Sequence, residues 1–258
     1  MNMMTQLQAL AAMGLFASLR YLPVMVIPSL SPFSWAPGMV RIALLLALSW
    51  LTLLSSPLIA FRDAWHQPVG LVLACAGELL LGLTFALAVM LPNAAMGLSA
   101  RLADMQAGLS AAALFNPAGQ HEPESMLGTI AMLAAVVLFF TLDLHLQLFQ
   151  MLTVSVQILP LGAMSLHLDF EAFLLLVSSS FLLGLSIMAP VILGLFAVDM
   201  GVAYATRSMP QANVYFLALP LKVAIAFLLL AMTLPFFPAL IGRLYQDAFA
   251  RVPAVFGA

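Results

Sequence analysis

Long apolar segments that carry almost no charge constrain this chain more than any other feature of its sequence. Hydrophobic residues make up 64% of its 258 residues and charged residues only 7%, whereas a soluble domain is usually about a quarter charged. So little polar surface cannot shield so many apolar side chains from water, and most of them must face lipid or other protein. The sequence therefore predicts an all-α, polytopic, hydrophobic protein that is associated with a membrane.

Six apolar segments are separated by prolines, glycines and scattered charges. They cover about residues 5–27, 39–60, 69–91, 126–158, 170–206 and 214–240. A helix that crosses a bilayer needs about 20 apolar residues, and the segments reach or exceed that length. Strands of a membrane barrel would instead alternate over about 10 residues between turns. We expect roughly six helical segments.

Several breaks between the segments carry local predictions. Asp169 and Glu171 are typical of the first turn of a helix, and Pro190 with Gly194 predicts a kink or a hairpin within 170–206. The stretch 115–125 is the clearest loop in the chain. In the tail, Arg243, Asp247 and Arg251 are spaced to share one helical face.

Ionisable residues recur within or beside the apolar segments. They are Arg20, Arg41, Glu78, Asp143, Asp199, Arg207 and Lys222. A charge that faces lipid at mid-bilayer costs a few kcal/mol, so we expect these side chains to face protein or water. The loops give three arginines on one side and two on the other, which does not determine the orientation in the membrane. Composition alone leaves two readings open: helices packed against other subunits, or a small-molecule transporter with a polar interior.

No pattern in the sequence indicates enzymatic chemistry. No zinc-protease, phosphate-binding or dinucleotide-binding motif occurs. Asp143 and His145 are two residues apart and would lie on different helical faces, and Cys75 is the only cysteine. We therefore expect no catalytic residues, no metal and no cofactor. A net charge of −2 gives no basic surface for nucleic acid.

Two stretches resemble signatures of the FliR/SctT family of type III protein-export gate subunits. The first runs from Gln106 through Gly108 and Ser110 to Phe115-Asn116-Pro117. The second and longer one is Arg207-Ser-Met-Pro210-Gln211-Ala-Asn213 followed by Pro220-Leu-Lys222. In the run Asp143-Leu144-His145, Leu144 stands where the family usually has glycine. The resemblance covers about residues 10–244.

The resemblance implies a role, a location and partners. Members of the family are core subunits of an export gate in the bacterial inner membrane, within the flagellar or injectisome basal body. They assemble with FliP/SctR-type and FliQ/SctS-type subunits, an FlhB/SctU-type subunit wraps the base, and unfolded substrates pass through the centre. The resemblance also implies a pore plug formed by the loop Leu114, Phe115, Asn116, Pro117, Ala118, Gly119 and Gln120.

The same resemblance predicts one domain over residues 1–258. Its first part, about 1–125, would hold the N-terminal helices and the plug loop, and 126–258 would hold the C-terminal hairpins. We favour the flagellar branch, with the injectisome branch as the alternative and a secondary transporter as an alternative of another class. We further hypothesise that Glu78, Arg207 and Lys222 pair with opposite charges in the chain or on its neighbours, and so fix the order of subunits.

Overall fold

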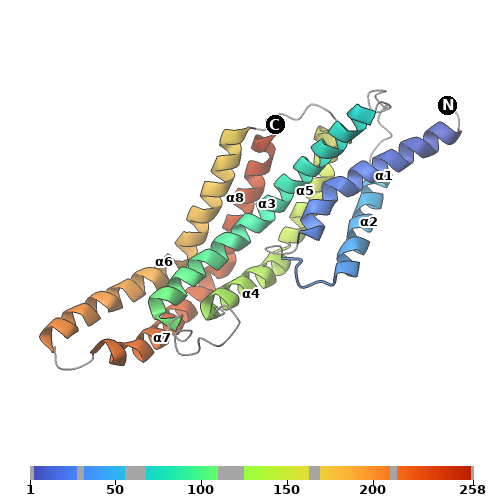
Figure 1. Ribbon diagram of the computed structural model, residues 1–258. Coiled ribbons are helices and arrows are strands. Elements are labelled where there is room, and N and C mark those ends of the chain that lie inside the picture. Colours follow the sequence, from blue (N-terminus) through green and yellow to red (C-terminus); the bar gives the residue numbers. More distant parts are fainter. Residues whose placement is uncertain are drawn as a thin grey trace. The chain divides into compact units, whose positions relative to one another are not determined.

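A computed structural model describes residues 3–27, 32–55, 68–109, 125–162, 169–209 and 214–256. Within these ranges every regular element is helical (Figure 1). The helices are α1 (Met3–Val26), α2 (Gly38–Ser55), α3 (Pro68–Ala107), α4 (Met126–Thr141), α5 (Leu144–Ile158), α6 (Phe170–Ser208), α7 (Val214–Thr233), the short 3-10 helix η3 (Leu234–Phe236) and α8 (Phe237–Val255). The all-α prediction is confirmed.

Three stretches are long and apolar enough to cross a membrane. They are Gly70–Ala107, Phe170–Ser208 and Phe216–Val255, and the bent pair α4 and α5 would add a fourth if it forms one span. The shorter apolar helices are Leu10–Val26 in α1 and Gly38–Leu54 in α2. Large apolar side chains such as Met39, Leu54 and Leu217 are exposed, as expected where lipid or other protein replaces water as the neighbour.

The helices divide into two compact units that interleave along the sequence. Unit 1 contains residues 1–91, 143–177 and 247–258, and unit 2 contains residues 92–142 and 178–246. Helices α3, α6 and α8 contribute residues to both units. The units are therefore not an N-terminal half and a C-terminal half of the chain.

Four segments differ in detail from the expected ones. The third continues through Pro92 and ends at Ala107 as α3. The fourth segment breaks into α4 and α5 at Asp143, which adopts a left-handed backbone conformation with φ 55°. Asp tolerates that conformation better than most residues, so it can end one helix and begin the next. The sixth segment breaks at η3, where Pro235 lacks the amide hydrogen that would continue the helical ladder.

A kink or a hairpin was expected within 170–206, and only the hairpin is wrong, because α6 continues as one helix through Pro190 and Gly194. Val191 and Leu195 are fully buried, and this packing offsets the hydrogen bond that Pro190 cannot make. A Cβ at Gly194 would lie 2.4 Å from a methyl carbon of Leu229. Gly194 thus serves close packing of α6 against α7 within unit 2.

In unit 1, α1 and α2 pack side by side as a hairpin (Figure 1). Helix α1 also approaches α3 closely, since a Cβ at Gly82 would lie 2.3 Å from the carbonyl oxygen of Arg20. Asp169 caps α6 by accepting hydrogen bonds from the backbone N–H groups of Glu171, at 2.9 Å, and Ala172, at 3.3 Å. The prediction of a helix start at Asp169 is confirmed.

Candidate functional site

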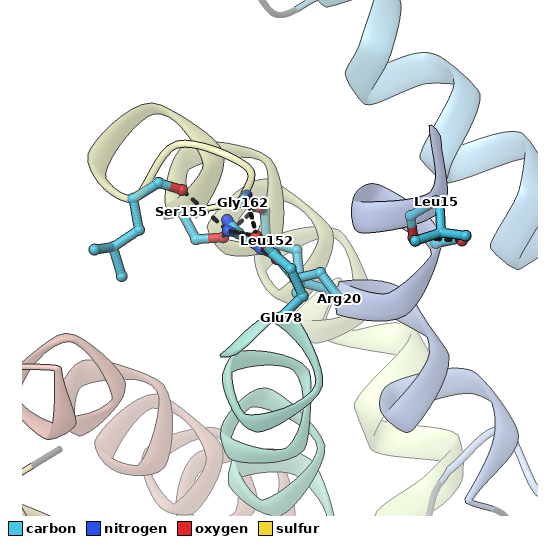
Figure 2. Close-up of polar contacts among 8 residues, drawn as sticks. Leu15, Arg20, Glu78, Leu152, Ser155 and Gly162 are labelled. Carbon is cyan, nitrogen blue, oxygen red and sulfur yellow. Dashed lines mark hydrogen bonds and ion pairs between the residues drawn. The ribbon is translucent and has the colours of Figure 1, made fainter. Parts of the chain in front are cut away.

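Arg20 of α1 and Glu78 of α3 form a buried ion pair in unit 1 (Figure 2). The Arg20 Nε donates to Glu78 Oε2 at 2.6 Å, and Nη2 donates to Oε1 at 3.0 Å. Arg20 is fully buried and Glu78 is 2% exposed. Two parallel N–H···O bonds hold the planar guanidinium in a fixed orientation against the carboxylate.

Three further hydrogen bonds link this ion pair to the end of α5 and the residues that follow it. Arg20 Nη1 donates to Ser155 Oγ at 3.1 Å, and Nη2 donates to the carbonyl oxygen of Leu159 at 3.0 Å. The Gly162 N–H donates to Glu78 Oε1 at 2.8 Å. The charges of Arg20 and Glu78 therefore compensate each other, and the uncharged groups at the end of α5 and just after it satisfy further hydrogen bonds of the pair, as buried charges require.

A second ion pair joins Lys222 of α7 to Asp199 of α6 in unit 2. The Lys222 side chain is 8% exposed and that of Asp199 is 37% exposed. The pair therefore lies at the edge of the packed helices, with the ammonium group buried and the carboxylate partly open. It connects the two helices on either side of the segment 210–213.

Stretches from the two signature regions meet beside this pair. Gly108 ends α3 with φ 79°, and a Cβ there would lie 2.9 Å from Leu219 of α7. Glycine adopts this left-handed conformation without a steric cost and is common after the last residue of a helix. Gly108 therefore satisfies both the turn and the close approach to α7.

An open groove of about 590 Å³ lies next to this contact in unit 2. Its polar lining is Gln106, Asp199 and Lys222. Its apolar lining comes from α3 and α6, namely Leu102, Met105, Leu185 and Ile192. Gln106 and Lys222, which belong to separate signature stretches, thus share one surface depression.

Asp104 of α3 anchors the start of α4. It is 4% exposed, accepts the N–H of Leu127 at 3.1 Å and of Gly128 at 3.4 Å, and also accepts the hydroxyl of Ser125. Ser125 in turn caps α4 by accepting the Gly128 N–H at 2.9 Å. A carboxylate at a helix N-terminus is favourable because that end carries a partial positive charge.

Comparison with known proteins identifies the family to which this chain belongs. Residues 11–248 match the bacterial export proteins, family 1. This chain belongs to that family. The match covers nearly all of the helical elements described above, and the resemblance read from the signature stretches is confirmed.

Curated relatives of this export-family chain come from two kinds of system. The flagellar biosynthetic protein FliR of Pectobacterium carotovorum is 27% identical over 202 residues, which are 77% of this chain and 76% of the relative. FliR of Escherichia coli is 27% identical over 175 residues, 67% of this chain and 66% of the relative. The Yop proteins translocation protein T of Yersinia pestis is 29% identical over 167 residues, 63% of each chain.

The other predicted site residues of this export-family chain lie at varied depths. Asp143 and Arg207 are exposed, and Arg41 is intermediate. Pro220 is exposed on α7 near Lys222. The predicted plug residues 114–120 and the signature residues Pro210, Gln211 and Asn213 lie outside the described residues. A role for each of these residues stays a prediction.

Two features of the site are not visible in the amino-acid sequence. Arg20 and Glu78 were each identified as misplaced charges, but neither was assigned to the other as a partner, because they are 58 positions apart. Asp104 is not among the candidate residues that the sequence indicates. Asp104 lies 21 residues before Ser125, and no local sequence pattern indicates a contact over that separation.

Proposed function

We propose that this chain is a core subunit of a type III export gate in the bacterial inner membrane. Together with FliP/SctR-type and FliQ/SctS-type subunits it would form the channel for unfolded export substrates, with an FlhB/SctU-type subunit at its base. The single observation that carries the proposal is the family match over residues 11–248. The whole chain would act as one export-gate domain, although its helices pack as two units.

The exposed apolar side chains and the internally neutralised charges support this role. Both Glu78 and Lys222 have an opposite charge within the chain. A transporter for small solutes would instead place such charges around a central substrate site. In an assembly subunit, neutral buried pairs leave apolar faces available for neighbouring helices or lipid.

We place the chain in a flagellar apparatus. The FliR of Pectobacterium carotovorum aligns over 202 residues, against 167 for the Yersinia pestis protein. An injectisome subunit is the second candidate because the latter alignment has a similar identity, 29%. Deleting the gene in its host separates the two: loss of motility supports the flagellar role, and loss of effector secretion with normal motility supports the other.

Purification of the full chain from its host in mild detergent tests the export-gate role. An affinity-tagged chain should recover two further small hydrophobic proteins in a stable complex. A monomer that carries solutes across liposomes would contradict the proposal.

The segment 114–120 would plug the closed pore, as the family resemblance implies.

A further inference from the structure

The second half of α6 carries a stripe of exposed side chains, which we call the α6 stripe. Its members are three or four residues apart and therefore share one helical face. They are Leu193, Phe196, Met200, Tyr204 and Arg207. The four uncharged members are 48–75% exposed, and Arg207 is exposed as well. Helix α7 lies beside α6 (Figure 1) but packs on another of its faces, where Gly194 approaches Leu229.

Arg207 adds a positive charge at the end of the α6 stripe, in the last turn of the helix. It takes part in none of the ion pairs among the described residues. The acidic residue that precedes it in α6, Asp199, already pairs with Lys222. The C-terminal end of a helix is a favourable place for a cation but does not cancel its charge. The stripe therefore ends in a cation whose counter-charge is not supplied by the described part of the chain.

A phospholipid matches this order of apolar and charged side chains. Acyl chains fit the apolar part of the stripe, tyrosine is enriched at the level of the headgroups, and long arginine side chains reach the membrane surface. The length agrees as well. From Leu193 to Arg207 the helix rises about 21 Å, and half of a bilayer with its headgroups measures about 20–22 Å. With Arg207 at the phosphates, Leu193 would lie near the middle of the bilayer.

We propose that the α6 stripe faces the bilayer and that Arg207 binds the phosphate group of an anionic phospholipid. A guanidinium can donate two parallel N–H···O bonds to one phosphate. An anionic lipid is favoured over a zwitterionic one because its net charge compensates that of Arg207, whereas a zwitterionic headgroup is already neutral. The inference goes beyond the proposed function, because it assigns a lipid-binding site and the depth of α6 in the membrane.

Native mass spectrometry of the complex purified from its host tests the phosphate site. After exchange into a mixture of phosphatidylglycerol and phosphatidylethanolamine, Arg207→Gln should retain about fivefold less phosphatidylglycerol than the wild type. Arg207→Lys keeps the charge and should retain most of it. Arg101→Gln removes an exposed arginine of α3 in the same unit and is the matched control, which should change nothing. Equal retention in Arg207→Gln and the wild type, or an equal loss in Arg101→Gln, would overturn the site.

Spin labels at single cysteines test the depth in the membrane. Cys75 is the only cysteine, so a Cys75→Ala background allows one label each at positions 193, 200 and 204. In the complex reconstituted in lipid nanodiscs, accessibility to oxygen should rise from 204 through 200 to 193, while accessibility to a water-soluble nickel chelate falls.

Three results would overturn the bilayer-facing stripe: labels shielded from both reagents, as beneath a neighbouring subunit, labels open to the chelate at all three positions, or no gradient between them. Purification without any other gate subunit would instead contradict the proposed function. Both lipid measurements can still be made on the chain purified alone, so the two failures are distinguishable.

Discussion

Arg20 Nε lies 2.6 Å from Glu78 Oε2, and the two residues are 58 positions apart in the chain. This ion pair joins α1 to α3 in unit 1. Because both side chains are buried, removal of either one leaves an uncompensated charge among apolar helices. Breaking the pair should therefore cost more stability than replacing both side chains together.

Arg20→Met and Glu78→Met should each lower the free energy of unfolding by about 3–5 kcal/mol. The double variant Arg20→Met/Glu78→Met should lose less than either single variant, because it leaves no unpaired charge. Denaturant titration of the purified protein in detergent measures all three. If the losses of the single variants simply add in the double variant, the two side chains are not energetically coupled.

Gly82→Ala should destabilise unit 1 by about 1–3 kcal/mol, as overpacking usually does. The added Cβ would lie 2.3 Å from the Arg20 carbonyl oxygen and 2.8 Å from Pro23 Cδ, and neither atom belongs to a flexible side chain. Gly201→Ala in α6 is the matched control, since nothing lies within 4 Å of a Cβ there. That variant should be neutral or stabilising by up to about 1 kcal/mol, and thermal unfolding in detergent compares the two.

Asp104→Ala should weaken the start of α4. It removes the acceptor of the Leu127 N–H and one acceptor of the Ser125 hydroxyl, at a cost of about 1–2 kcal/mol. Ser125→Ala should cost a similar amount, and the double variant should cost less than the sum because both residues serve the Gly128 N–H. Hydrogen exchange of residues 126–130 measures the local opening; unchanged exchange in Asp104→Ala would count against this anchoring role.

Removing the charge of Asp199 should impair the protein more than removing the charge of Lys222. Asp199→Asn leaves the buried Lys222 ammonium without its counter-charge, whereas Lys222→Met leaves a carboxylate that water or a neighbour can still reach. We expect recovery of the gate complex to fall several-fold more with Asp199→Asn than with Lys222→Met, because desolvating an unpaired charge is the larger cost. Equal or reversed losses would show that Lys222 has a role beyond charge neutralisation.

Deleting residues 117–120 should make the closed gate leak small solutes, if the segment 114–120 plugs the pore. The control replaces Pro117-Ala118-Gly119-Gln120 with four glycine and serine residues, which keeps the length and changes the composition. Permeability of cells to a small solute is the measurement. An intact barrier in the deletion variant would remove the plug assignment without affecting the family assignment.

The sequence by itself determined the helical class, the approximate segments and the family. Apolar runs with few charges leave helices as the structures that satisfy their own backbone in lipid, and signature stretches such as Pro220-Leu-Lys222 are contiguous and can be read directly. The start of α6 at Asp169 was likewise visible, because a helix cap depends on neighbouring residues alone.

Only the tertiary structure decided which charged residues pair and at which of the predicted positions a helix ends. Arg20 meets Glu78, Ser155 and Leu159 because three helices converge there, and no local pattern encodes such distant contacts. Pro190 and Gly194 were expected to kink the helix or to end it in a hairpin, and burial of the neighbouring residues keeps α6 continuous, so no hairpin forms there. Propensity acts over a few residues, whereas packing sums many contacts over the fold and can overrule it.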